Sequence, residues 1–373
     1  MRFLSWSLAA LVIQGFQPLA VEAALPKYRI DAIAPVVGIP HILGGMNDLG
    51  TIYGSVYDQP SGFSGTFIRE KDQYRSLGTL GGRFSVPVDL NNRGQLIINA
   101  YGMNGGDGSA PFIYRDGRVN PIPLPAGAIA GSATVQDIND AGQILGWART
   151  SGTAGAYFVH DSRGSRFLDT GTLPSARLAV LNDKGEIFSV VEDGASGESR
   201  LAIYRNGDFT LLPPLPDVPS DRDSIRYFPL ALNNAGQALF TILSRAGRDS
   251  VDLTFVYGQG QYTQFGPNLF FGVDMNEKGW AVGSLSSEEI EPPPDRIAVF
   301  RDGEFEYLDR LVRPADAGKW TFWNSYAIDA RGRILGRGSL GSFIATPVPE
   351  PATALLLGAG IGLIGVALRR RAA

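Results

Sequence analysis

The sequence predicts an all-β protein, a seven-bladed β-propeller of four-stranded blades. Three observations support this fold class: a turn motif that recurs seven times, a second hairpin within most periods, and partial blades at the two ends of the repeat region. The motif places an apolar residue, Asn or Asp, two further residues and Gly before a β-run. Its glycines are at positions 50, 94, 142, 185, 236, 279 and 332, a mean step of 47 residues, and periods of about 40 to 50 residues are typical of propellers or arrays.

Each copy of the motif has the chemistry of a tight β-hairpin. The side chain of Asn or Asp can accept a hydrogen bond from its own backbone two residues on, and Gly supplies the positive φ that closes the turn. INDAGQILG from Ile138 and LNNRGQLII from Leu90 show the pattern most clearly. We therefore expect the first two strands of each blade, a and b, to meet at this turn.

A second hairpin follows the first in most periods. PFIYRDGRVNPIPL from Pro111, LAIYRNGDFTLLP from Leu201 and IAVFRDGEFEYL from Ile297 each contain an Asp-Gly or Asn-Gly turn between two β-runs, with looser versions from Ala156 and Leu253. These runs predict strands c and d. Four strands at this period make one propeller blade.

The ends of the repeat region predict how the ring closes. The seventh copy supplies strands a (323–329), b (333–337) and c (342–346) but no d strand, whereas residues 28–33 alternate like a d strand ahead of the first turn. Pairing 28–33 with 342–346 would remove two open sheet edges. An open solenoid is the alternative, although a solenoid would need complete polar caps.

Composition excludes several functions. The 373 residues carry a net charge of -4, and the repeats contain no Lys/Arg-rich patch, which argues against a nucleic-acid partner. The absence of cysteine excludes disulfides, thiolate metal sites and thiol nucleophiles.

The first 23 residues resemble a secretory signal peptide. Arg2 provides a short positive region, residues 3–13 are largely apolar, and Val21 and Ala23 are the small residues of a signal-peptidase site. We expect export and cleavage. An uncleaved anchor is the alternative, but the apolar run is short.

No catalytic, metal or cofactor site emerges between residues 25 and 346, the predicted propeller. Only two histidines are present, His41 and His160, and they fall in different repeats, so a Ser/His/Asp triad is not indicated. The stretch from Asp137 to Gly142 begins like an EF-hand loop but lacks the closing Glu, so a hairpin turn is the better interpretation. The sequence predicts a protein that is not an enzyme.

Residues 347–373 form a three-part tail. Val348, Pro349, Glu350 and Pro351 precede 17 apolar residues, 352–368, and then Arg369, Arg370 and Arg371. A run of 17 residues is at the lower limit for a transmembrane helix. The arginines should stay in the cytoplasm, which places the propeller outside the inner membrane.

This tail resembles the PEP-CTERM sorting signal of Gram-negative bacteria. The resemblance covers about the last 26 residues and implies an exosortase as partner, an inner-membrane intermediate, and a link to exopolysaccharide or biofilm. The repeats resemble the HAF-type extracellular repeat through SLGTLGG at 76–82 and DTGTLPS at 169–175, a likeness that weakens in the last four blades. Neither resemblance implies a ligand.

Two functions from different classes remain. The preferred one is a non-enzymatic surface or extracellular-matrix protein whose propeller binds exopolysaccharide or a surface protein. The alternative is a propeller hydrolase or lyase acting on polysaccharide, which would need paired carboxylates in the axial channel, about 5 to 9 Å apart.

Any partner is expected on one face of the ring. The tight turns fall at a–b and c–d, whereas longer irregular segments are predicted at b–c or d–a: 58–65, 101–110, 149–155, 191–198, 213–226, 244–252 and 285–294. Variable loops on a rigid scaffold usually carry recognition. The polar candidates on this loop face are Asp221, Arg222, Asp223, Glu288, Glu289 and Glu291.

Overall fold

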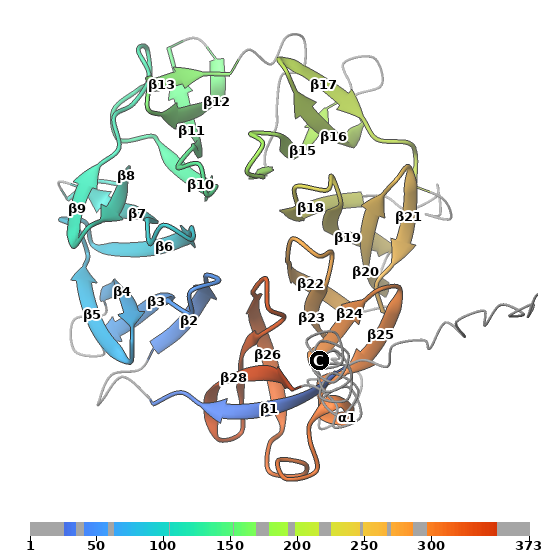
Figure 1. The fold of residues 1–373 in the computed structure, drawn as a ribbon. Helices are drawn as coiled ribbons and strands as arrows, with labels where there is room; N and C mark the ends of the chain where they lie inside the picture. Colours follow the sequence, from blue (N-terminus) through green and yellow to red (C-terminus); the bar gives the residue numbers. More distant parts are fainter. Residues whose placement is uncertain are drawn as a thin grey trace, which may run out of the picture.

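The computed structural model is a ring of seven antiparallel sheets, each of four strands, around a central axis (Figure 1). It describes residues 26–34, 41–58, 63–103, 105–151, 153–168, 179–192, 198–215, 225–246, 249–266, 270–285 and 297–348. The first strand of each repeat lies nearest the axis and the last lies at the rim (Figure 1). The predicted seven-bladed propeller of four-stranded blades is confirmed.

Blades 1 to 3 follow the chain in order, each strand pairing with the next. Their strands are β2 (His41–Met46), β3 (Ile52–Asp58), β4 (Phe63–Glu70), β5 (Gln73–Gly78); β6 (Phe84–Leu90), β7 (Leu96–Met103), β8 (Gly108–Arg115), β9 (Arg118–Pro121); and β10 (Thr134–Ile138), β11 (Ile144–Thr150), β12 (Thr153–Asp161), β13 (Gly164–Phe167).

Blades 4 to 6 repeat the same meander. Their strands are β14 (Ala179–Leu181), β15 (Ile187–Glu192), β16 (Ser199–Arg205), β17 (Asp208–Leu211); β18 (Ile225–Leu232), β19 (Ala238–Ala246), β20 (Asp249–Gly258), β21 (Gln261–Gln264); and β22 (Phe270–Met275), β23 (Ala281–Leu285), β24 (Ile297–Arg301), β25 (Glu304–Tyr307).

Blade 7 is built from both ends of the repeat region. It consists of β26 (Phe322–Ile328), β27 (Ile334–Gly338), β28 (Gly341–Val348) and, at the rim, β1 (Lys27–Ala32). β1 runs antiparallel to β28 from Lys27 opposite Val348 to Ala32 opposite Phe343. The predicted closure by the N-terminal strand is therefore confirmed, with the ladder two residues longer at the C-terminal end of β28 than expected.

Both predicted turn types form as expected. At the first a–b turn the Leu49 N–H donates to Asn47 Oδ1 at 3.1 Å, and Gly50 has φ +85°. At the c–d turns, Asp116 with Gly117 and Asn206 with Gly207 all have positive φ, which is the signature of the type I′ hairpin. The strands are thus specified locally, by turn residues whose own backbone conformation forms the hairpins.

Hydrophobic burial takes place between blades. The described residues form seven buried clusters, and each draws its side chains from two neighbouring blades, so that every junction of the ring has its own core. A single four-stranded sheet cannot cover both of its faces, so the blades depend on one another for stability.

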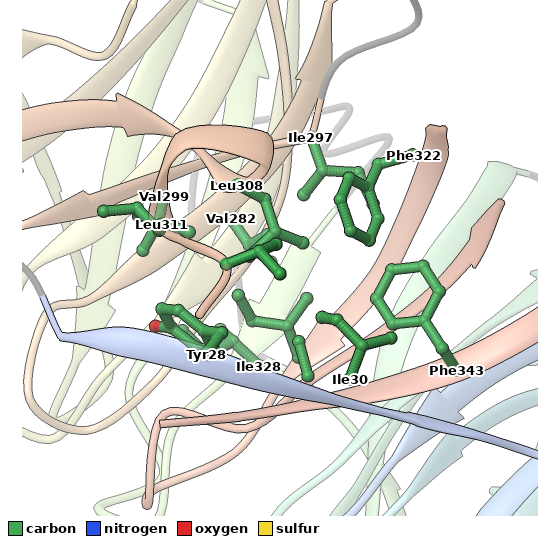
Figure 2. Close-up of a cluster of buried hydrophobic side chains, with 13 residues drawn as sticks. Tyr28, Ile30, Val282, Ile297, Val299, Leu308, Leu311, Phe322, Ile328 and Phe343 are labelled. Carbon is green, nitrogen blue, oxygen red and sulfur yellow. The ribbon is translucent and has the colours of Figure 1, made fainter. Parts of the chain in front are cut away.

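The closing strand joins the largest of these clusters (Figure 2). Tyr28 is fully buried and Ile30 is 8% exposed, and both pack with residues of blades 6 and 7. A one-turn helix that the sequence did not predict, α1 (Leu308–Leu311), places Leu308 and Leu311 in the same cluster. The N-terminal strand therefore supplies core as well as hydrogen bonds.

Three predicted loops are wrong and one predicted element is not described. Segments 101–110, 149–155 and 244–252 are mostly strand. β7 extends to Met103 and β8 begins at Gly108, β11 extends to Thr150 and β12 begins at Thr153, and β19 extends to Ala246 and β20 begins at Asp249. In the described part of the chain no helix is long and apolar enough to cross a membrane, and the predicted span 352–368 lies outside that part.

We predict that deleting residues 25–34 abolishes cooperative unfolding. The deletion removes Tyr28 and Ile30 from the core and leaves β28 with an unpaired edge. Calorimetric or circular-dichroism melting would measure this. The double variant Arg29→Ala, Asp31→Ala changes exposed residues of the same strand and should melt almost like the wild type. A truncated chain with the wild-type transition would contradict closure by β1.

Candidate functional site

The axis of the ring contains a cavity of about 470 Å³, open on the face of the a–b turns. The ends of the inner strands of all seven blades line it, together with a–b turn residues of every blade except blade 5. Among the described residues, its lining includes no Lys, Arg or His but seven carboxylates: Asp48, Asp89, Asp137, Asp140, Asp183, Asp274 and Glu277. The hydrogen bonds around this cavity decide whether its carboxylates could act on a bound ligand.

A ring of amide hydrogen bonds surrounds the cavity. The Asn that opens each a–b turn donates from Nδ2 to the backbone carbonyl of the corresponding residue in the next blade, at 2.8 to 3.4 Å. The donors of this asparagine ring are Asn47, Asn91, Asn139, Asn182, Asn233 and Asn276. All six are buried, so each bond satisfies groups that water cannot reach.

Blade 7 closes the asparagine ring with different residues. Asp329 stands where the other turns have Asn and cannot donate. Instead, Arg333 pairs with the Asp329 carboxylate and donates from its guanidinium to the Asp48 carbonyl of blade 1 at 3.0 Å. The arginine therefore replaces the missing amide at the junction where the two ends of the repeat region meet.

A second ring of bonds uses the residue that follows each Asn. Its backbone N–H donates to the side chain at the same position in the next blade, at 2.6 to 3.0 Å. The acceptors are Asn92, Asp140, Asp183, Asn234, Glu277 and Asp48. Ala330 has no side-chain oxygen, so the junction of blades 6 and 7 lacks this bond. The carboxylates at the rim of the cavity thus connect blades.

Three deeper carboxylates sit at β-bulges of the inner strands. The ladder shifts register at Asp89, Asp137 and Asp274, and a bulge re-aims the side chain. Asp137 accepts the Leu181 N–H of the next blade at 2.5 Å, and Asp274 accepts the Ile328 N–H at 2.9 Å. These residues therefore form a third layer of contacts between blades.

Burial changes the acidity of these carboxyl groups. Burial raises the pKa of Asp137 well above its usual value, and the neighbouring Asp89 raises it further. Burial also raises the pKa of Asp274, to about 6, although the backbone N–H groups of Ile328 and Met275 oppose the shift. Asp89 and Asp137 both accept the Ile138 N–H, at 3.3 and 2.8 Å, so the two carboxylates lie side by side, as a pair used for acid–base chemistry would.

Tyr53 fills the cavity next to these carboxylates. Its hydroxyl donates to the Val88 carbonyl at 2.9 Å, and burial raises its pKa well above the usual value, with the charge of Asp89 adding to the effect. A Cβ at Gly44 or Gly45 would lie 2.5 or 2.7 Å from the Tyr53 ring. The Gly-Gly pair of β2 is therefore what lets a tyrosine occupy this place.

A groove lies on the opposite, loop face of the ring, between blades 7 and 1. Its volume is about 570 Å³, and it lies at the start of β2, the end of β3, the start of β4 and the β27–β28 turn. The residues of this blade 7–1 groove are Ile33, His41, Ile42, Ser55, Tyr57, Ser64, Arg337, Leu340, Gly341 and Ser342.

Most residues singled out in the sequence fall outside the described part of the chain. These are Val21, Ala23, Asp221, Arg222, Asp223, Glu288, Glu289, Glu291, Pro349, Glu350, Pro351, Arg369, Arg370 and Arg371. Val348 is described, as the last residue of β28 opposite Lys27. His41 and His160 lie in blades 1 and 3, so the structure does not bring them together.

Sequence reasoning missed Asp89 and Asp274, and it considered Asp137 only as the start of a calcium-binding loop. Their signal is an Asp two residues before the turn Asn, in VDLNN, QDIND and VDMNE. It occurs in only three copies, so the repeat consensus concealed it. Among the described residues, no group of three or more His, Cys, Asp or Glu side chains could hold a metal ion.

Comparison with known proteins identifies the tail and the fold. Residues 347–371 match the family described as the PEP-CTERM protein-sorting motif. The chain carries a PEP-CTERM sorting motif. This motif implies export, processing by an exosortase and membrane-associated sorting in a Gram-negative bacterium. No curated protein matches the chain in sequence.

Solved structures resemble the ring. A puromycin-hydrolyzing peptidase of Mycobacterium tuberculosis is 12% identical with a TM-score of 0.50, covering 81% of this chain and 49% of its own. Prolyl oligopeptidase B of Galerina marginata is 10% identical with a TM-score of 0.51, covering 82% and 46%. TolB of Acinetobacter baumannii is 14% identical with a TM-score of 0.42, covering 60% and 52%. The chain thus spans about half the length of these proteins, and at such identities the likeness concerns the fold alone.

We predict that Asp274 makes stability depend on pH. Its pKa is about 6 in the folded protein, against about 3.9 in an unfolded chain, so the folded state binds the extra proton between these values. This contribution is complete below about pH 4 and is lost as pH rises through about 6. Relative to Asp274→Asn, the wild type should lose about 3 kcal/mol of unfolding free energy between pH 4 and pH 7.

Urea unfolding at a series of pH values measures this difference. Asp116→Asn, at an exposed turn, is the matched control and should follow the wild-type profile. Parallel profiles for the wild type and Asp274→Asn would show that the carboxyl group titrates normally.

Proposed function

We propose that this chain is an exported, non-enzymatic binding protein of the bacterial surface or extracellular matrix, linked to exopolysaccharide or biofilm. The observation that carries the proposal is the PEP-CTERM motif at the end of β28, the last strand of the propeller along the chain. The motif supplies an exosortase as partner and a sorting route. The propeller supplies a scaffold for recognition.

The tail and the leader support the proposed route. A signal peptide at 1–23 would start export, and residues 352–368 with Arg369, Arg370 and Arg371 would hold the chain in the inner membrane with the ring outside. The exosortase would then act at Pro349, Glu350 and Pro351 and release the protein to the surface or matrix.

The ring supports the role of scaffold. Three layers of hydrogen bonds and a separate core at each junction make the blades rigid relative to one another. A rigid ring presents its b–c and d–a connections on one face, where loops can vary without loss of stability. The exopolysaccharide or surface-protein partner would bind there, and Asp221, Arg222, Asp223, Glu288, Glu289 and Glu291 stay as predicted contacts.

The contacts of the deep carboxylates support a non-enzymatic role. Asp137 accepts backbone N–H groups on both carboxylate oxygens, from Ile138 at 2.8 Å and from Leu181 at 2.5 Å. A catalytic carboxylate must be free to give or take a proton at the substrate. Moving Asp137 would break the junction of blades 3 and 4. Its structural role is therefore enough to explain its presence, without any catalytic role.

The polysaccharide hydrolase or lyase remains the second candidate, because one observation favours it. Asp89 and Asp137 lie side by side in an axial cavity, and burial raises the pKa of Asp137, which is the paired-carboxylate arrangement such an enzyme would use. The Tyr53 hydroxyl lies in the same cavity. The two candidates make opposite predictions for the fate of the polymer.

We predict that Glu350→Ala stops maturation and retains the protein in the inner membrane, because it removes the only charge of the Pro-Glu-Pro motif. Membrane fractionation and the intact mass of cell-associated and released protein would measure both processing events. Glu304→Ala, on exposed strand β25, should mature normally. Normal surface delivery of Glu350→Ala would count against sorting through this motif.

We also predict that the full-length protein binds the exopolysaccharide of its own cells without shortening it. Co-sedimentation measures binding, and size-exclusion chromatography measures polymer length. Asp137→Asn should leave polymer length unaffected. If the wild type shortens the polymer and Asp137→Asn does not, the protein is a hydrolase or lyase.

A further inference from the structure

We propose that the blade 7–1 groove binds a segment of an acidic polysaccharide, a chain of sugars that carry carboxylate groups. The inference rests on the proposed binding function and names its ligand class. The groove has a volume of about 570 Å³, within the range of about 300 to 1,000 Å³ that is typical of ligand sites.

The groove exposes large apolar side chains that would normally be buried. Ile42 is 62% exposed, Tyr57 is 44% exposed and Leu340 is 64% exposed. They come from three separate strands or turns and line one hollow. Single exposed apolar residues are ordinary, but a group of them in one concavity marks a site of interaction.

Polar groups in the same groove fit a hydroxylated ligand. Ser55, Ser64 and Ser342 each present a hydroxyl that can both donate and accept a hydrogen bond. A pyranose ring has an apolar C–H face bordered by hydroxyl groups. The combination of Tyr57 with serine hydroxyls matches both parts of such a ring.

Charge in the groove selects an acidic ligand. Arg337 is exposed and lines the groove, and none of the described lining residues is Asp or Glu, although the whole chain has a net charge of -4. The axial cavity is the reverse, with seven carboxylates and no basic residue. An anionic polymer would be repelled from the axis and attracted to the groove, where a guanidinium can hold a carboxylate with two hydrogen bonds.

The walls of the groove favour a sugar over a peptide strand. β3, β4, β27 and β28 each have a hydrogen-bonded neighbour on both sides, so they offer no free edge to which a peptide strand could be added, and β2 has its unpaired side at the inner edge of its sheet. The Ile33 N–H donates to the Ser342 carbonyl at 2.8 Å, which fixes one wall to the closing strand. The hydroxyls and the apolar side chains are therefore held on a prepared surface.

The test measures binding of full-length protein, purified in a mild detergent, to three polymers of matched length: polygalacturonate, neutral dextran and poly-glutamate. Isothermal titration calorimetry should detect polygalacturonate alone. Arg337→Gln and Tyr57→Ala should each weaken this binding about tenfold. Arg115→Gln changes another exposed arginine and Leu49→Ala another exposed apolar residue, both on the opposite face, and neither should weaken binding.

Each other outcome has a defined meaning. If the protein binds poly-glutamate tightly but does not bind polygalacturonate, the ligand is not a polysaccharide, and an acidic protein partner is indicated. Equal binding of dextran, or polygalacturonate binding that is insensitive to salt, would overturn the role of Arg337. If the protein binds its own matrix but none of the three polymers, the proposed function stands and this inference fails. Thermal melting of each variant shows whether it is folded, and the salt titration of the wild type needs no variant.

Discussion

The fold depends on one repeated contact, the hydrogen bond from an asparagine amide to the backbone carbonyl of the next blade. Asn91 illustrates it: Oδ1 accepts N–H groups within its own turn, and Nδ2 donates to Asn139 of the neighbouring blade. The same side chain therefore shapes the turn and joins two blades. Because both functions need an amide, the residue at this place is Asn in six of the seven copies.

The strands, their order and the closure could be predicted from the sequence because their signals are local. Turn residues such as Asp116 and Gly117 impose their own conformation. The contacts between blades could not be predicted in the same way. That Asp137 reaches Leu181, 44 residues away, depends on a bulge and on the spacing of two sheets, and no local pattern encodes either.

The candidate sites also differ in how far local sequence predicts them. The loop face follows from the topology, and the blade 7–1 groove lies on it. However, Arg337 and Tyr57 come from blades at opposite ends of the repeat region, so only the closed ring brings them together. The residues expected from the sequence, such as Glu288 and Asp221, were chosen by charge within single loops. Sequence reasoning finds such clusters more readily than a surface shared between distant segments.

The position of Val348 has a mechanical consequence. This residue is both the last partner of the closing strand, opposite Lys27, and the first residue of the Val-Pro-Glu-Pro sequence, so no spacer separates the ring from the sorting motif. A tether of a few residues spans only about 10 Å. As long as the proposed anchor is in the membrane, the end of β28 in blade 7 must therefore stay within about 10 Å of the lipid surface. Cutting the tail beyond Val348 would free the disc without removing any strand from it.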